Sequence, residues 1–168
     1  MHHQFLLMIT GLPGTGKTTF AMALAAHLDF PHFNSDMLRA ELGRKGRYDA
    51  ESKQFIYNSL LERVAQALKA GKSVIVDATF YKEQLRRTFE EMGAAFEVPV
   101  IWIELHAAEH HIKERVAQDR PYSEADYEVY LQVKESYEPL AKTHLSFWTD
   151  QLTISEMIVQ TEAYLSEI

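Results

Sequence analysis

The sequence predicts an α/β fold of three layers, with a five-stranded parallel sheet between two layers of helices. Two observations predict it. Apolar runs of strand length alternate with longer stretches of helical composition along the chain. The first of these runs is followed directly by a glycine-rich loop and a helix. The 168 residues, 46% of them hydrophobic and 24% charged, suit one globular domain spanning residues 1–168.

The glycine-rich loop fits the phosphate-binding pattern of glycine, any four residues, glycine, lysine and then serine or threonine. Glycines allow such a loop to turn backbone N–H groups toward phosphate oxygens, and the following helix adds its positive dipole end. We expect Lys17 to reach the β- and γ-phosphates and the Thr18 hydroxyl to ligate Mg²⁺. The sequence therefore predicts a P-loop NTPase fold that binds ATP with Mg²⁺. The candidate nucleotide-binding residues are Gly11, Leu12, Pro13, Gly14, Thr15, Gly16, Lys17, Thr18 and Thr19.

The elements around this loop support the assignment. Residues 5–10 form a continuous apolar run, which is typical of a parallel strand buried on both faces. Residues 19–28 are rich in Ala, Leu and Met and predict a helix. Residues 31–34 predict a short second strand, and residues 37–42 have helical composition. The loop thus lies in the strand–loop–helix context that its chemistry requires.

Two polar residues follow the carboxyl end of the second strand. Ligands of open α/β sheets collect at this edge, so Asp36 and Arg39 are candidates for chemistry. Ser35 or Asp36 could instead serve only as the N-cap of the next helix. The glycine-flanked basic loop at residues 43–47, which ends at Arg47, could be merely solvated or could recognise an anionic substrate.

A second acid follows the third predicted strand. Residues 50–70 predict a long amphipathic helix that ends at Gly71. Residues 73–79 then form an apolar strand that carries Asp77 near its end. In phosphate-loop proteins a carboxylate at this place holds Mg²⁺, directly or through water. The alternative is that Asp77 merely begins the next turn.

The rest of the chain continues the alternation without repeats or low-complexity tracts. Gly93 is expected to end one helix, Ser123 with Asp126 to form a capping box, and Ser155 to cap the last helix. The expected segments are helices at 81–92, 107–118, 123–138 and 156–165, and strands at 98–105 and 144–148.

The composition excludes several classes of protein. The chain has no cysteine, so disulfides and thiolate metal sites are excluded. No apolar run approaches the length of a membrane span, and a cytoplasmic location is the default expectation. The formal net charge of −7 argues against extended nucleic-acid binding, which usually requires a basic excess, although one nucleotide end could still enter a pocket.

Several motifs together resemble a known family. They are the glycine-rich loop, Asn34-Ser35-Asp36 with Arg39, Val74-Ile75-Val76-Asp77-Ala78-Thr79-Phe80, Arg115 with Arg120, and Tyr137-Glu138-Pro139-Leu140. This combination resembles the small P-loop "predicted kinase" family. That family is similar to the kinase domain of polynucleotide 5′-hydroxyl kinase and, more remotely, to gluconate, shikimate and adenylate kinases, zeta toxin and chloramphenicol phosphotransferase. The resemblance covers roughly residues 5–140.

The resemblance implies the strand order 2-3-1-4-5, a small helical lid at about residues 117–123, and several roles. Asp36 would match the general base that takes the proton of an acceptor hydroxyl. Arg39 would orient that acceptor or its phosphate, and Thr79 is a further candidate on the acceptor side. Arg115 and Arg120 would close over the transferred phosphoryl group. They are five residues apart rather than the usual four, and both could instead be surface charges.

The sequence thus predicts an ATP-dependent phosphotransferase that acts on a hydroxyl of a small molecule or nucleotide end. In such a reaction the protein mostly positions the reactants and stabilises negative charge. An ATPase, or a nucleotide-binding regulatory module without a small-molecule acceptor, is the alternative.

Overall fold

A computed structural model describes residues 4–120 and 125–168. Five strands form one parallel sheet in the order β2-β3-β1-β4-β5, which confirms the order that the family resemblance implies. The central strand β1 pairs with β3 on one side and with β4 on the other. The strands are β1 (Leu6–Thr10), β2 (His32–Asn34), β3 (Val74–Asp77), β4 (Val100–His106) and β5 (Leu145–Trp148).

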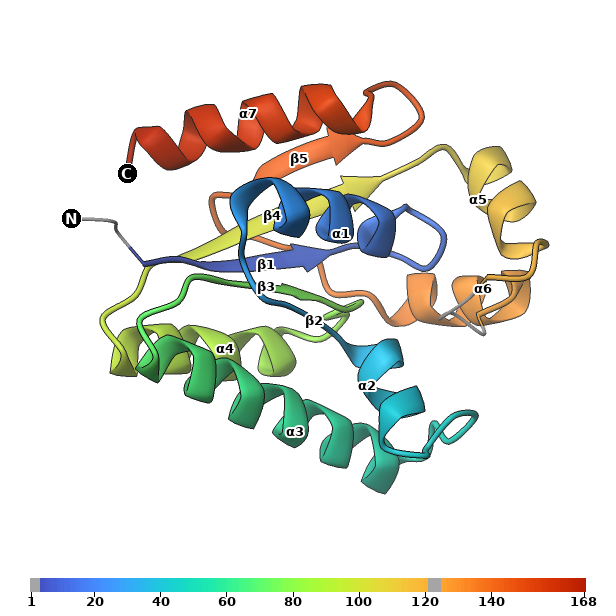
Figure 1. Cartoon of the computed structure of the whole chain (residues 1–168). Coiled ribbons are helices and arrows are strands. Elements are labelled where there is room, and N and C mark those ends of the chain that lie inside the picture. Colours follow the sequence, from blue (N-terminus) through green and yellow to red (C-terminus); the bar gives the residue numbers. More distant parts are fainter. Residues whose placement is uncertain (1–3, 121–124) are drawn as a thin grey trace.

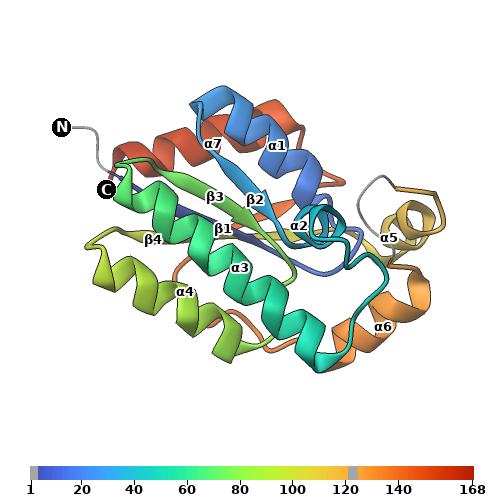
Figure 2. The ribbon, with the colours of Figure 1, turned by 60° about the horizontal axis from the view of Figure 1, so that its bottom comes forward.

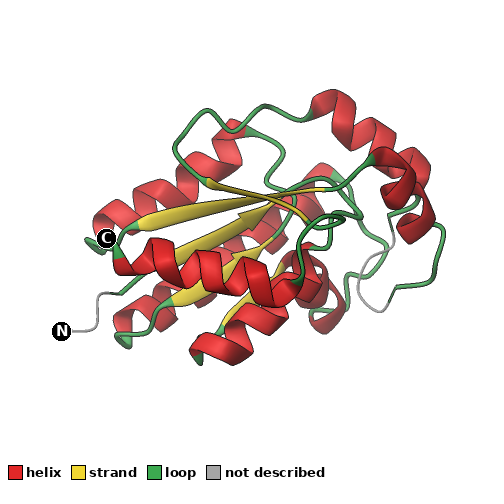
Figure 3. Cartoon of the chain, turned by 90° about the horizontal axis from the view of Figure 1, so that it is seen from above, coloured by secondary structure: helices red, strands yellow, loops and turns green. Residues whose placement is uncertain are grey.

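Helices cover both faces of this sheet (Figures 1 and 3). Helices α1 and α7 lie on one face, α3 and α4 lie on the other, and α2, α5 and α6 lie beyond the carboxyl ends of the strands (Figures 1 and 2). The helices are α1 (Lys17–Leu28), α2 (Ser35–Glu41), α3 (Ala50–Lys69), α4 (Glu83–Ala95), α5 (Glu109–Val116), α6 (Tyr127–Ser136) and α7 (Ile154–Ser166). No described helix is both long and apolar enough to cross a membrane.

The apolar run of β1 is buried because the strand supplies side chains to two cores. Leu6 and Met8 pack into the cluster beneath α3 and α4, whereas Leu7 and Ile9 pack into the cluster beneath α1 and α7. All four side chains are fully buried. A strand that contacts helices on both faces has no solvent-facing positions, so its sequence shows no polar alternation. This double burial fixes the position of the loop that follows β1.

Two helix starts differ from the sequence expectation. Helix α1 begins at Lys17 rather than Thr19, because Gly16 takes a left-handed φ of 91° that turns the loop directly into the helix. Helix α2 begins at Ser35, and its N-cap is Asn34, whose side chain accepts a hydrogen bond from the Met37 N–H at 2.8 Å. Neither Ser35 nor Asp36 is therefore the cap.

Other caps also differ. Gly93 does not end α4 but lies inside it, where a Cβ would come within 2.2 Å of Val100 Cγ2, so this glycine allows a close helix–strand approach. The last helix is capped by Thr153 rather than Ser155, in a capping box with Glu156. Asp126 caps α6, whereas Ser123 and part of the expected lid lie outside the described residues.

Candidate nucleotide and acceptor site

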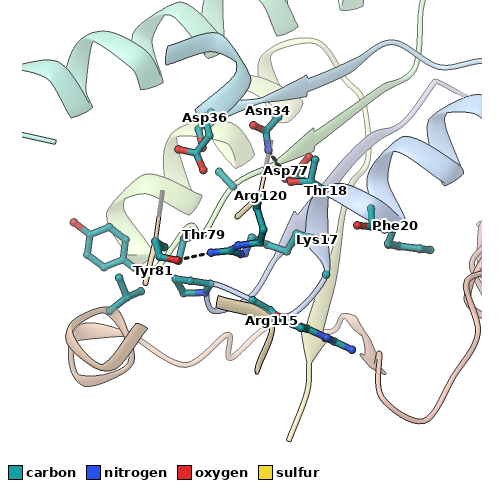
Figure 4. A pocket seen from close by; sticks show the side chains of 18 of the residues that line it. Lys17, Thr18, Phe20, Asn34, Asp36, Asp77, Thr79, Tyr81, Arg115 and Arg120 are labelled. Atoms are coloured by element: carbon teal, nitrogen blue, oxygen red, sulfur yellow. Dashed lines mark hydrogen bonds between the residues drawn. The ribbon is translucent and has the colours of Figure 1, made fainter. Parts of the chain in front are cut away.

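A cavity of about 1060 Å³ opens at the carboxyl edge of the sheet. The glycine-rich loop and the first turn of α1 form its floor, and the ends of β2 and β3 form one side. Residues of α2, α3, α6 and α7, together with the segments that follow α5 and β5, complete the wall. The edge predicted from the sequence therefore holds the cavity, and Figure 4 shows the side chains that face it.

The glycine-rich loop takes a conformation that only glycine supports at its first position. Gly11 has φ of 145°, and a Cβ there would lie 2.5 Å from the Leu105 carbonyl oxygen of β4. Gly14 and Gly16 also have positive φ, at 80° and 91°. The sequence pattern therefore reflects a backbone requirement as well as access for a phosphate.

Neighbouring side chains bind the carbonyl oxygens of this loop. Lys17 Nζ donates to Leu12 O at 3.0 Å, and Arg115 Nη1 donates to Gly14 O at 3.2 Å. Thr149, which follows β5, donates to Thr15 O at 2.8 Å and accepts from Arg115 at 2.9 Å. A loop held by its carbonyl oxygens can direct its N–H groups toward an anion.

The ammonium group of Lys17 is poised for an anionic ligand. Burial lowers the pKa of Lys17 to about 8, against the opposing effect of Asp77 and Asp36, and the charge of Arg120 lowers it further. Phosphate oxygens would reverse this effect, because an adjacent negative charge favours the protonated amine. An anion bound beside Lys17 would therefore stabilise a charge that burial makes less favourable.

Asp77 lies in a buried polar group at the ends of β2 and β3. Thr18 Oγ1 donates to Asp77 Oδ1 at 3.1 Å, and Asn34 Nδ2 donates to the same carboxylate oxygen at 2.6 Å. His32 Nε2 pairs with the other oxygen, Oδ2. These contacts fix both oxygens of a carboxylate that is only 1% exposed.

The Thr18–Asp77 pair fits Mg²⁺ in its donor chemistry. Mg²⁺ prefers oxygen ligands and is commonly held by one or two protein oxygens together with substrate phosphates and waters. Among the described residues no cluster of three His, Asp or Glu forms a metal cage, and Mg²⁺ bound with a nucleotide does not need one.

Asp36, which lies near Asn34 (Figure 4), also lines the cavity and pairs with Arg39. Arg39 Nη1 donates to Asp36 Oδ1 at 2.7 Å, and its guanidinium carbon lies 4.5 Å from the centre of the Tyr48 ring. Arg39 is 5% exposed, and its Nε has no hydrogen-bond partner among the described residues. A buried donor of this kind favours a ligand that brings an acceptor oxygen.

The two predicted lid arginines lie in different places. Arg115 lies on the far side of Lys17 from Asp36 and contacts the backbone of the glycine-rich loop (Figure 4). Arg120 lies close to both Lys17 and Asp36. Its charge contributes to the lowered pKa of Lys17, whereas burial lowers the pKa of Arg120 itself and the charge of Asp36 opposes that lowering. Arg120 donates to Ala125 O, and its Nε is buried without a partner among the described residues.

Thr79 lines the cavity as expected, whereas Arg47 lies on an exposed loop and is not among the lining residues. Sequence reasoning missed several residues that do contribute to the site. Asn34 is marked in the sequence only as part of a motif, although its position at the carboxyl end of a strand is typical of both caps and ligands. The contacts of Thr149 and Lys53 join segments far apart in the chain, and no local pattern marks them. The missed residues are His32, Asn34, Lys53, Tyr57, Tyr81 and Thr149.

Comparison with curated proteins finds a partial relative. The bifunctional polynucleotide phosphatase/kinase of Schizosaccharomyces pombe is 24% identical over 107 residues, which make up 64% of this chain and 22% of that protein. The chain thus spans about a fifth of the length of this relative.

Solved structures share the fold over nearly the whole chain. A protein from Chloroflexus aurantiacus that is provisionally assigned as a kinase has a TM-score of 0.80 at 22% identity, with 99% of this chain and 98% of that chain covered. The APS kinase CysC of Mycobacterium tuberculosis, solved with AMPPNP and APS, has a TM-score of 0.72 at 16% identity, with 99% of both chains covered.

A family match agrees with this fold and with the loop geometry. The AAA_33 family, described as an AAA domain, matches residues 6–140, which run from β1 to the segment after α6. The matched range includes the glycine-rich loop, Asp36, Asp77 and both arginines. The chain therefore belongs to the AAA_33 family.

Proposed function

We propose that the chain is an ATP-dependent phosphotransferase that moves the γ-phosphoryl group of ATP to a hydroxyl of a small molecule or nucleotide end. The observation that carries this proposal is that Lys17 and Asp36 line one cavity, and that Arg120 is close enough to both to interact with their charges. An ATPase without an acceptor needs no second carboxylate in the cavity in addition to Asp77. The polynucleotide phosphatase/kinase and APS kinase names of the similar proteins support the same class.

The glycine-rich loop and Lys17 would hold the phosphates of ATP. Mg²⁺ on Thr18 and Asp77 would supply positive charge to the β- and γ-phosphate oxygens. Arg120 would contribute a further positive charge, and its Nε, which has no partner among the residues that the structure describes, would be a donor for an oxygen of the transferred group. Arg115 would keep the loop in its binding conformation through the Gly14 carbonyl.

Asp36 would act on the acceptor. The acceptor oxygen forms a bond to the γ-phosphorus, the bond from that phosphorus to the β–γ bridging oxygen breaks, and the acceptor proton passes to an Asp36 oxygen. ADP leaves with the bridging oxygen. Arg39 would orient the carboxylate through its hydrogen bond to Oδ1. Because the transition state is loose, the position of Asp36 matters more than its basicity.

The test is ADP release with Mg²⁺ and ATP against a panel of hydroxyl compounds that includes nucleosides, short oligonucleotides with free 5′-hydroxyls, sugar acids and hydroxylated antibiotics. We expect at least one class of acceptor to stimulate ADP release. Asp36→Asn should reduce this stimulation by a factor of about 10² to 10⁴. Glu41→Gln is the matched control, because Glu41 is on the same helix but pairs outside the cavity with Arg63. Steady ADP release that no acceptor changes would contradict the proposal and favour an ATPase or a regulatory module.

A further inference from the structure

Three tyrosines line the cavity on the side of Asp36. They come from three different segments, with Tyr48 before α3, Tyr57 within α3, and Tyr81 after β3. Tyr81 lies with Asp36 and Thr79 on one side of Lys17 (Figure 4). Aromatic side chains bury a large flat area at a low cost in conformational entropy, and they favour partners with a flat face.

Tyr57 is the fixed member of this group. Its ring packs on Phe80 with the ring centres 6.0 Å apart. Burial raises the pKa of Tyr57, and the nearby Tyr81 and Asp36 raise it further, against the effect of Arg39. The Tyr57 hydroxyl therefore stays protonated at neutral pH and can donate a hydrogen bond to a ligand inside the cavity.

The same region carries a cation without an acidic partner. Lys53 lies one turn before Tyr57 on α3, lines the cavity, and places its ammonium 6.0 Å from the centre of the Tyr81 ring. Among the described residues no carboxylate pairs with Lys53. Lys82 lies at a similar distance, 5.8 Å, from the same ring but pairs with Glu138 and does not line the cavity.

The charge of the cavity is opposite to that of the chain. Its described lining includes two acids, Asp36 and Asp77, in a chain of formal net charge −7. The positive lining residues are Lys17, Arg39, Lys53, Arg115 and Arg120. In the proposed reaction Lys17 and Arg120 would interact with the phosphates of ATP. Arg115 binds the glycine-rich loop, and Arg39 donates a hydrogen bond to Asp36. Lys53 is the cation that the proposed reaction does not use.

We propose that the acceptor is an alcohol that carries both a flat aromatic or heteroaromatic ring and an anionic group, with the ring against Tyr81 and Tyr48 and the anion near Lys53. This inference rests on the proposed phosphotransferase function and names the acceptor class for the same site. A ring stacks on an aromatic wall, whereas an aliphatic sugar acid offers no flat π-face. An uncharged ring compound would leave the Lys53 ammonium without a counter-charge.

Two matched sets of acceptors separate the contributions of ring and charge. The first is 4-(hydroxymethyl)benzoate, benzyl alcohol and 6-hydroxyhexanoate, which carry the ring with the anion, the ring alone and the anion alone. The second is a nucleoside monophosphate, the corresponding nucleoside and ribose 5-phosphate. In at least one set, we expect the compound that carries both ring and anion to have a kcat/KM at least about tenfold higher than either the ring-only or the anion-only compound. The set in which this occurs distinguishes a simple aromatic acid from a nucleotide.

Variants assign the effect to the named side chains. Tyr81→Leu should raise the KM for the preferred acceptor about five- to 100-fold, the range that stacking on one aromatic side chain gives. Lys53→Met should reduce the preference for the anionic over the neutral member to less than about threefold, and Lys53→Arg should restore it. Lys82→Met is the control, since Lys82 contacts the same ring from outside the cavity, and it should change neither KM nor preference.

The failures of the two proposals are distinguishable. If an anion-only compound matches the ring-plus-anion compound, the acceptor class is wrong while the phosphotransferase function stands. If no acceptor changes ADP release, the phosphotransferase function fails. Calorimetric binding of 4-(hydroxymethyl)benzoate and the nucleoside monophosphate in the presence of AMPPNP then decides whether the site takes ligands of this ring-plus-anion class. Binding that Tyr81→Leu abolishes would support this class, and no binding of either compound would overturn it.

Discussion

The two halves of the cavity are built in different ways. The half where we propose that ATP binds, the nucleotide half, is a backbone structure, in which consecutive residues from Gly11 to Thr18 shape a loop whose first position only glycine supports. The half where we propose that the acceptor binds, the acceptor half, is a side-chain structure, to which α2, α3 and the segment after β3 each contribute residues such as Asp36, Tyr57 and Tyr81. A backbone site can be recognised from a short motif, whereas a side-chain site depends on how distant segments pack. This difference predicts that the two halves respond to different substitutions.

Replacement of Gly11 by Ala should damage the nucleotide half most. The added Cβ would lie 2.5 Å from Leu105 O and 2.8 Å from Thr15 Oγ1, at φ of 145°. We expect a loss of about 3 kcal/mol in the free energy of unfolding, together with loss of ATP binding. Chemical denaturation and ATP titration measure the two effects.

Gly71→Ala is the control for Gly11→Ala, because Gly71 has φ of 74° but nothing within 4 Å of an added Cβ. It should cost only about 1 kcal/mol and leave ATP binding intact. Equal losses in both variants would show that φ alone, rather than the close approach of β4, sets the requirement at Gly11.

Replacement of Arg86 by Met should damage the acceptor half. Arg86 is buried on α4 and donates to Phe80 O at 3.2 Å, Glu138 O at 2.8 Å and Pro139 O at 3.2 Å, so it joins the segment after β3 to the segment after α6. We expect a loss of about 2 kcal/mol in stability, because these buried carbonyl groups lose their donor. The KM for the acceptor should rise while the dissociation constant of ATP changes little.

Arg87→Met is the matched control for Arg86→Met, since the neighbouring Arg87 is exposed and, within the described part of the chain, forms an ion pair only with Glu83. It should shift stability by less than about 0.5 kcal/mol. Steady-state kinetics with both substrates varied would separate the two KM values. An equal rise in both would contradict the independence of the two halves.

A smaller effect concerns pH and only the nucleotide half. Lys17 in the free protein has its pKa lowered to about 8, and bound phosphates raise it. Below pH 8 the amine is already charged, and the affinity for ATP should be constant. Above pH 8 binding must take up a proton, so affinity should fall by up to about tenfold per pH unit until the pKa of the complex is reached.

Lys17→Arg should remove this pH slope, because a guanidinium stays charged throughout the range. Calorimetry of ATP binding between pH 7 and 10 in buffers of different ionisation enthalpy would measure the proton uptake directly. A flat affinity profile in the unaltered protein would show that Lys17 is fully charged before ATP binds.

Local patterns predicted much of the fold and the backbone half of the site. The apolar run of β1, the glycine-rich loop and Asp77 at the end of β3 could be assigned because each depends on adjacent residues. Strand order was implied by family resemblance and confirmed by the structure. The cap at Thr153 was also within reach of the sequence, because Thr153 and Glu156 have the spacing of a capping box.

The remaining features depend on long-range packing. Gly93 looked like a helix stop, but its role is set by Val100 on β4, which only the folded structure brings close. The place of Arg115 depends on Gly14, 101 residues away, and on Thr149, 34 residues away. Lys53, Tyr57 and Tyr81 carry no motif of their own. They become a site only when α3 and the end of β3 meet at one edge of the sheet.

The contact between Arg115 and Gly14 joins α5 to the glycine-rich loop that we propose binds phosphate. A rigid-body movement of α5 must therefore either carry the Gly14 carbonyl with it or break that hydrogen bond. In the first case the N–H groups of the loop are reoriented, and in the second the loop loses a restraint. Both outcomes would change how fast a bound nucleotide escapes. Substitutions on the outer surface of α5, at positions that contact neither substrate, should thus change the rate of ADP dissociation. Where that step limits the reaction, they should also change kcat.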